Sequence, residues 1–334
     1  MKRVFSALVL CSLLFSAHAQ EQNQQETARS FMKQGDWDNA ILVLNRAVQA
    51  DPKNLDLQKD LILSYYYKRD YANALEKVKT ALENDDADVA VYQLAGNVYK
   101  ALEQPKDAEK LYKRGLKKFP TSGALYSEFG ELLWSSQDYS AIEQWEKGIQ
   151  QDPSYAGNYY NAARYYYYTK DNVWTVLYGE IFVNMESLTE RAIAMKKMVY
   201  DAYKQKLFAN ADLMKGTDKN TPDFAKAFLQ TMSKEASLAN KGITTETLTM
   251  IRARFILDWF ANYGSKYPFK LFDYQQQLLK QGLFEAYDQW LFGTVESLPA
   301  YDNWTKTHTE AHENFTAFQK NRVFKIPAGQ YYGK

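Results

Sequence analysis

Residues 137–155 read QDYSAIEQWEKGIQQDPSY, and the same arrangement of small and large residues occurs three times earlier in the 334-residue chain. The alanine that opens the pattern stands at Ala40, Ala74, Ala108 and Ala141, so the spacings are 34, 34 and 33 residues. A constant spacing of this size is typical of stacked helical hairpins, in which each repeat is one structural unit. The period therefore predicts an all-α repeat array.

The residue types in the pattern suit a pair of antiparallel helices. Small residues are needed where two backbones approach most closely, and an aromatic residue four positions later, Tyr112 or Trp145, fills the space beside them. A proline follows most units because it cannot continue a helix. A partner helix precedes each pattern, with apolar residues three and four apart such as Tyr92, Ala95 and Tyr99. Each unit is therefore expected to be one helical hairpin.

These residues resemble the tetratricopeptide repeat (TPR) family over residues 21–155, in four clear repeats. The first helices carry a large–small–Gly–Tyr pattern, and the second helices carry Ala, an aromatic residue, Ala or Gly, and Pro. The resemblance implies a superhelix of hairpins and a scaffold function, but it does not indicate which partner is bound. Residues 156–186 continue the register as a degenerate fifth repeat, so the predicted array covers 20–186.

The remaining residues, 187–334, are predicted to form a C-terminal α-helical domain. Amphipathic spacing predicts one long helix over 188–208, and a threonine cap predicts another over 244–264. Residues 268–299 repeat the offsets of the TPR pattern, so a diverged repeat-like hairpin is expected there. A last helix over 302–320, with the tail that follows it, is expected to cap the open end of the stack.

The first 19 residues have the three parts of a secretory signal peptide. A basic start is followed by an apolar run over 4–15 and an A-x-A site at 17–19, and the run is too short to span a membrane. Cleavage would leave 315 residues with a net charge of −1, because it removes two of 41 Lys and Arg and none of 40 Asp and Glu. We therefore expect an exported bacterial envelope protein, periplasmic or secreted, with no later transmembrane segment.

No catalytic motif is present in the predicted mature chain. Loss of the only cysteine, Cys11, with the signal peptide excludes thiol chemistry and cysteine metal sites. The near-neutral charge, without a basic block, gives no footprint for nucleic acid. No phosphate-binding loop, dinucleotide fingerprint or nucleophile elbow occurs. His308 and His312 have the spacing of two zinc ligands, but no third ligand is identifiable. We predict no metal, no cofactor and no catalysis.

The TPR resemblance implies that certain first-helix positions face a concave groove. The spacing i, i+4, i+7, i+8 places Tyr160, Arg164, Tyr167 and Tyr168 on one face of a helix. Tyr159 and Tyr166 are then core residues, and Tyr165 meets a neighbouring helix. Lysine and asparagine occur at groove positions in other units, but they do not complete the carboxylate clamp known in some TPR proteins. The predicted partner-binding residues are Lys59, Tyr66, Tyr67, Asn97, Lys100, Trp134, Tyr160, Arg164, Tyr167 and Tyr168.

These observations favour a non-catalytic scaffold or adaptor of the bacterial cell envelope that binds a peptide or protein in the concave TPR groove. Arginine among tyrosines is a frequent composition of protein-binding hot spots. The first alternative is a glycan-binding envelope protein, because the same aromatic rings can stack on sugars; titration with oligosaccharides would separate the two. The second alternative is an enzyme with its active site in the C-terminal domain, which metal analysis of His308 and His312 variants would reveal.

Overall fold

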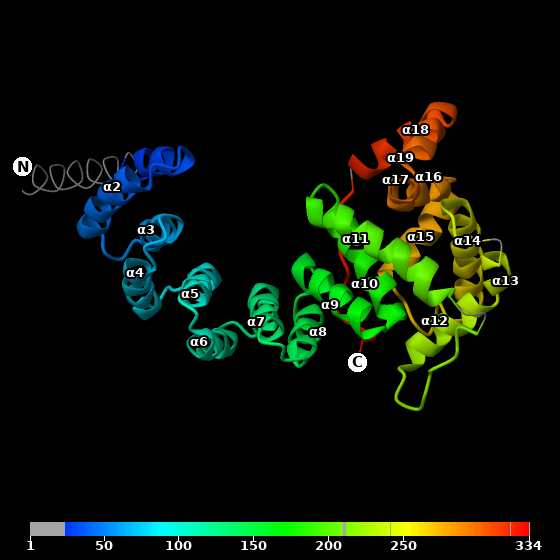
Figure 1. The fold of residues 1–334 in the computed structure, drawn as a ribbon, viewed down its shortest axis with the longest axis horizontal. Helices are drawn as coiled ribbons and strands as arrows, with labels where there is room; N and C mark the ends of the chain where they lie inside the picture. The colour runs from blue at the N-terminus through cyan, green and yellow to red at the C-terminus, as the bar shows by residue number, and fades with distance from the viewer. Residues whose placement is uncertain (1–23, 210–211, 241, 321, 334) are drawn as a thin grey trace, which may run out of the picture. The chain divides into compact units, whose positions relative to one another are not determined.

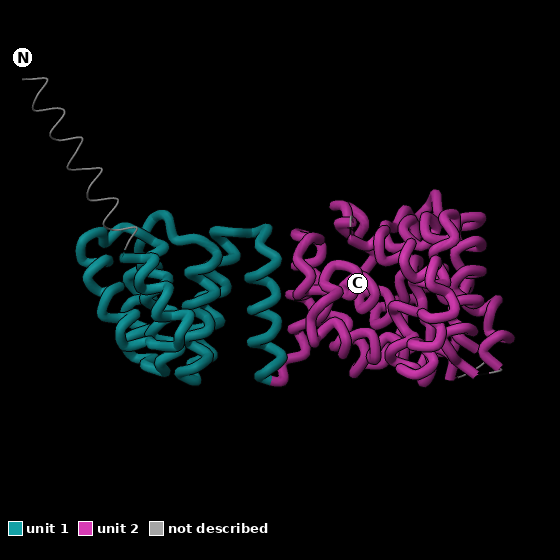
Figure 2. Tube along the Cα trace, turned by 90° about the horizontal axis from the view of Figure 1, so that it is seen from above, with its two compact units in different colours: residues 1–136 teal, residues 137–334 magenta. Residues whose placement is uncertain are grey.

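The protein is described here from a computed structural model that divides into two compact units, residues 1–136 and 137–334 (Figure 2). The described residues are 24–209, 212–240, 242–320 and 322–333. Within them all regular secondary structure is helical, as Figure 1 shows, which confirms the predicted all-α class. The predicted signal peptide lies outside the described residues. The predicted domain boundary after residue 186 follows repeat identity, whereas the compact units follow spatial contacts.

Unit 1 is a series of helix pairs. Residues 24–33 are helical and precede the first of them. Asp, Asn or Ser side chains cap the helices that follow by accepting backbone N–H groups, except at α6, which has Pro105 in its first turn. The helices are α2 (Trp37–Ala50), α3 (Leu55–Tyr67), α4 (Tyr71–Glu83), α5 (Val89–Ala101), α6 (Pro105–Lys118) and α7 (Gly123–Ser135).

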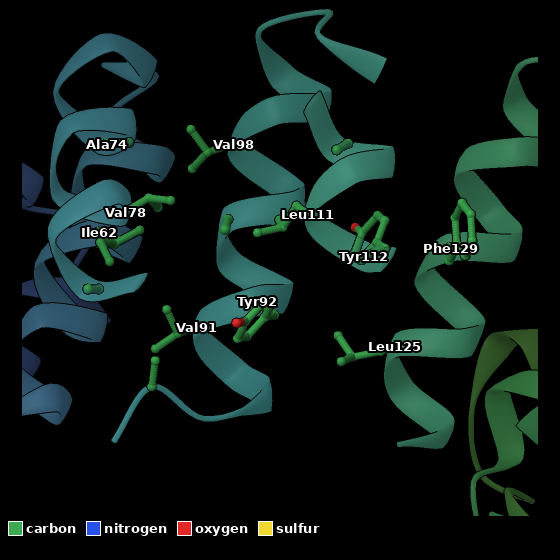
Figure 3. Close-up of a cluster of buried hydrophobic side chains, with 14 of the residues drawn as sticks. Ile62, Ala74, Val78, Val91, Tyr92, Val98, Leu111, Tyr112, Leu125 and Phe129 are labelled. Carbon is green, nitrogen blue, oxygen red and sulfur yellow. The ribbon is translucent and has the colours of Figure 1, made fainter. Parts of the chain in front are cut away.

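The core of unit 1 depends on close approach at small residues. The pattern alanines of these repeats are fully buried, as the sequence predicted. A Cβ on Gly96 would stand 2.0 Å from Tyr112 Oη, and a Cβ on Gly115 would stand 2.8 Å from Tyr92 Cδ1. Figure 3 shows Tyr92, Tyr112 and Leu125 between these helices. The glycines are therefore needed to admit the tyrosine rings of the facing helix.

One turn geometry recurs between the two helices of every repeat. The residue at the turn has a left-handed backbone, and the next N–H donates to the carbonyl five residues earlier, at 2.9–3.0 Å in four of the five repeats. The turn residues are Gly35, Arg69, Glu103, Gln137 and Lys170, with φ between 55° and 75°. The same turn occurs at Gly282, where φ is 68° and Leu283 N–H donates to Leu278 O at 2.9 Å. The backbone thus repeats the 34-residue period and returns to it near the C-terminus.

Substituting Gly35 tests this turn. We expect Gly35→Ala to lower the free energy of unfolding by about 1 kcal/mol, because an L-residue pays for the left-handed conformation. No atom lies within 4 Å of the added Cβ, so a clash does not contribute. Glu103→Ala is the matched control, since that turn already holds an L-residue. Urea unfolding should show a change for Gly35→Ala alone, and equal changes in both variants would contradict the explanation.

Unit 2 is built around α10 (Asn172–Met185), which is buried from Val173 to Asn184. It packs against α9 on one side and against α11, the π-helix η1 and α12 elsewhere. The other elements are α8 (Ala141–Gln151), α9 (Ala156–Thr169), α11 (Glu190–Asp201), η1 (Ala202–Leu207), α12 (Asp223–Ser233), α13 (Ala236–Ala239), α14 (Thr245–Asn262), α15 (Lys270–Lys280), α16 (Phe284–Asp288), the π-helix η2 (Gln289–Gly293), α17 (Thr294–Glu296), α18 (Leu298–Thr307) and α19 (Thr309–Lys320).

Two predicted helices of unit 2 differ from the structure. The predicted helix over 188–208 is α11 followed by the π-helical turn η1, in which the hydrogen-bonded loop holds one extra residue. The predicted helix over 302–320 is divided at His308, whose backbone leaves the helical region with φ −123° and ψ 43°. The His308 ring stacks on Trp304 with centroids 5.1 Å apart. Short-range spacing predicts helix but not these interruptions.

A buried charge cluster joins four helices of unit 2. Arg252 of α14 donates to Glu180 of α10 and to Asp288 of α16, and each of the three side chains is at most 2% exposed. Gln275 of α15 and Tyr287 of α16 also donate to Glu180, both at 2.6 Å. Burial raises the pKa of Asp288 to about 7, although the Arg252 charge opposes that shift. The cluster holds α10 among the C-terminal helices.

Removing one charge of this cluster should be costly. We expect Glu180→Gln to lower the free energy of unfolding by about 3–5 kcal/mol, because it leaves a buried arginine incompletely compensated. Asp302→Asn is the control, since it breaks the exposed pair between Asp302 and Lys306 and should cost less than about 1 kcal/mol. Urea unfolding followed by tryptophan fluorescence measures both. Equal effects would show that the cluster does not hold unit 2 together.

The C-terminal tail lies along unit 2 without regular structure. Phe324 and Ile326 are buried, and the Tyr332 ring stacks on Phe224 with centroids 4.6 Å apart. Gln330 Oε1 accepts a hydrogen bond from Lys270 N–H at 2.6 Å, so the tail also covers the start of α15. The tail therefore belongs to the core of unit 2.

Candidate functional site

The tyrosines of α9 separate in the way their spacing predicts. Tyr159 and Tyr166 are buried, and the Tyr166 hydroxyl donates to the buried Glu146 at 2.6 Å. Tyr165 lies against Trp145 of the preceding helix, with ring centroids 6.3 Å apart. The prediction for these three core and packing tyrosines is confirmed. Burial raises the pKa of Glu146, although tyrosine hydroxyls that donate to it oppose the shift.

The remaining polar and aromatic residues of α9 form a partly open surface. Tyr160, Arg164 and Tyr167 are half-buried, and Tyr168 is 60% exposed. Two cations from the following elements, Arg191 of α11 and Lys206 of η1, contact this surface. We call the six residues the α9 surface: Tyr160, Arg164, Tyr167, Tyr168, Arg191 and Lys206.

The first half of the α9 surface centres on the Tyr160 ring. The guanidinium groups of Arg164 and Arg191 each lie 5.3 Å from its centroid, and the Phe182 ring lies 5.0 Å away. Arg191 also forms a two-point ion pair with Glu186, and its hydrogen bonds lower the pKa of that carboxyl. In the described part of the chain no ion pair joins Arg164 to a carboxylate, so its donors are available to a ligand.

The second half of the α9 surface centres on Tyr167. Lys206 Nζ lies 3.2 Å from the Tyr167 ring centroid and 2.5 Å from the Tyr167 carbonyl oxygen. Tyr168 meets the same ring edge-on, with centroids 5.6 Å apart. Partial burial lowers the pKa of Lys206, and the positive charge of Lys170 adds to that effect, whereas Asp201 opposes it. Partial burial also raises the pKa of Tyr167. A cation is thus held on this ring without an ion pair among the described residues.

The predicted cationic residues of unit 1 have a different environment. Lys59 lies 2.8 Å from Asp56 and 3.0 Å from Asp88, and Lys100 lies 2.7 Å from Glu128. Partial burial disfavours the Lys59 charge, but hydrogen bonds to both aspartates outweigh it and raise the pKa. These lysines therefore tie one helix pair to the next.

The predicted aromatic and amide residues of unit 1 are also placed by the structure. Tyr67 is 55% exposed and stacks on Trp37 with centroids 5.1 Å apart, and Tyr66 meets Tyr67 edge-on at 5.7 Å. Asn97 and Trp134 are half-buried on α5 and α7. The predicted set is thus divided between the two units, and the structure brings Tyr160, Arg164, Tyr167 and Tyr168 together in unit 2.

Two residues of the α9 surface were not predicted from sequence. Arg191 and Lys206 lie in residues 187–267, for which the sequence indicates helices and no function. They reach α9 through tertiary packing, and no local motif marks them. Their amphipathic helix was visible in the sequence, but the element against which it packs was not.

The described residues contain no group of three or more His, Cys, Asp or Glu side chains arranged to hold a metal ion. His308 is exposed at the end of α18. None of the helices in the described ranges combines the length and apolar character required to cross a membrane.

The recurrent turns and close-packed small residues define the chain as a helical-hairpin repeat protein. A family model described as tetratricopeptide repeat matches residues 26–90. The chain is therefore a TPR protein, as its repeats indicated.

Several solved structures are similar to the chain at low identity. YrrB, described as a TPR protein with an unusual peptide-binding site, is 20% identical and covers 52% of this chain and 90% of its own, with a TM-score of 0.38. PilF of Pseudomonas aeruginosa is 15% identical, with coverages of 56% and 86% and a TM-score of 0.47. MamA of Desulfovibrio magneticus RS-1 is 13% identical, with coverages of 51% and 97% and a TM-score of 0.41. Comparison with curated proteins found no match.

Proposed function

We propose that the protein is a non-catalytic interaction scaffold of the bacterial cell envelope, and that it binds a protein or peptide partner through the α9 surface. The envelope location rests on the signal-like first 19 residues. The scaffold function rests on the TPR architecture, which presents side chains from successive helices to a partner.

The observation that supports this site is the exposure of Tyr168 beside Arg164, whose donors have no carboxylate partner in the described ranges. Tyr and Arg contribute much of the binding energy at protein interfaces, because they bury large areas at a small entropic cost. The residues around them are already ordered by packing on α10, so binding requires little further ordering. A preformed surface of this kind suits capture of a partner better than it suits chemistry.

Affinity capture from a bacterial envelope extract tests the proposal. The bait is the chain without residues 1–19, compared with a variant carrying Arg164→Glu and Tyr168→Ala. These two substitutions avoid Tyr160 and Tyr167, whose rings contact neighbouring elements. We expect a partner retained by the unmodified chain to fall at least about tenfold on the variant, the loss expected from two hot-spot residues. Quantitative mass spectrometry measures the retained amount.

The control bait carries Tyr139→Ala and Lys280→Glu, which remove an exposed tyrosine and reverse an exposed charge elsewhere in unit 2. Circular dichroism confirms that each bait is folded. Equal retention by all three baits would remove the α9 surface from the proposal. If no protein is retained by any bait, the scaffold function itself fails, and titration with oligosaccharides becomes the next experiment.

A further inference from the structure

We infer that the α9 surface binds a linear peptide segment rich in aspartate and glutamate. This inference rests on the proposed function and names the chemistry of its partner. It follows from the charges, shape and exposure of the six residues.

The charge environment differs between the two units. In unit 1 each cation predicted to bind a partner already has a carboxylate from the next helix pair: Asp88 for Lys59 and Glu128 for Lys100. Arg29 and Asp60 make a similar link at 2.8 Å. A ligand carboxylate would have to compete with these internal pairs, so unit 1 offers an acidic ligand little.

On the α9 surface the cations exceed the anions that contact them. Arg164 and Lys206 contact tyrosine rings and a backbone carbonyl, and within the described ranges neither forms an ion pair. Arg191 has one carboxylate, Glu186, and Asp201 is the acidic residue whose charge acts on Lys206. Three cations therefore face two carboxylates, and Lys170 adds a fourth positive charge near Lys206.

The environment of these cations also favours carboxylate ligands. Arginine binds carboxylates through two parallel N–H donors, and such charge-assisted bonds strengthen when water is partly excluded. The Tyr160 and Tyr167 rings supply apolar walls on which the cations rest. Tyr168, at 60% exposure, offers a ring and a hydroxyl to the ligand backbone.

The shape of the surface suits a linear segment. Residues 160–168 rise about 12 Å along the helix axis, which matches about four residues of extended peptide. The cations lie at both ends of that span, Arg164 and Arg191 at one end and Lys206 at the other. A segment with acidic residues at two or more positions would therefore meet both ends.

Selection from a display library of short random peptides tests the inference. The baits are the chain without residues 1–19, the same chain with Arg164→Gln, and a control with Lys280→Gln. We expect the first and third baits to select sequences enriched in Asp and Glu. A selected peptide, measured by fluorescence anisotropy, should bind Arg164→Gln about ten- to hundredfold more weakly, the loss expected for a charge-assisted contact. Its affinity should fall as salt is added, and less steeply for Arg164→Gln.

A charge-reversal variant provides a second measurement. Arg164→Glu should shift the selected sequences away from acidic residues, and Lys206→Glu should do the same independently. Circular dichroism of every bait excludes unfolding as the cause. Selection of neutral or basic peptides by the unmodified chain would overturn the inference, as would acidic peptides that bind Arg164→Gln equally well.

The two proposals fail in distinguishable ways. If no peptide is selected but the envelope extract yields a partner that depends on the α9 surface, the partner is recognised as a folded protein and the linear-segment inference is wrong. If neither experiment yields a partner, the proposed scaffold function is wrong as well.

Discussion

Burial of Glu180 in the middle of α10 is the constraint on which unit 2 depends. A carboxylate in a helix that is buried on every side must be compensated, and Arg252, Gln275 and Tyr287 supply the compensation from two other stretches of the chain. This requirement brings α14, α15 and α16 against the second helix of the fifth repeat. The α9 surface then results from packing: α10 positions the buried side of α9, and Arg191 and Lys206 reach its other side from the elements that follow.

The two units use their cations in different ways. In unit 1, lysines and aspartates or glutamates connect successive helix pairs, so the polar positions of the first helices contribute to the stack itself. In unit 2, Arg164 and Lys206 rest on tyrosine rings and keep donors available. The repeat register is the same in both units, as the left-handed turns at Glu103 and Lys170 show. What differs is the charge of the residues that neighbour the register positions.

The sequence predicted the repeat fold and the division of the α9 tyrosines because both depend on spacing along a helix. Close approach at Gly96 and burial of Tyr166 follow from a 34-residue period and from side-chain direction. Spacing could not predict the π-helical turns, the break at His308, or the contacts of Arg191 and Lys206. Those depend on which distant segment packs against which, and the pairing of Arg252 with Glu180 joins positions that no local pattern relates. The candidate site was therefore predictable on α9 and not beyond it.

Site-specific photo-crosslinking in living cells tests the central claim, that a protein partner binds the α9 surface, most directly. A photoreactive phenylalanine replaces Tyr168 in one strain and, in control strains, the exposed residues Leu257 of α14 and Tyr67 of unit 1. The account predicts an adduct with a second protein from position 168 and none from position 257 or 67. An adduct from position 67 alone would place the binding surface in unit 1. Adducts from none of the three positions would contradict a protein partner at α9.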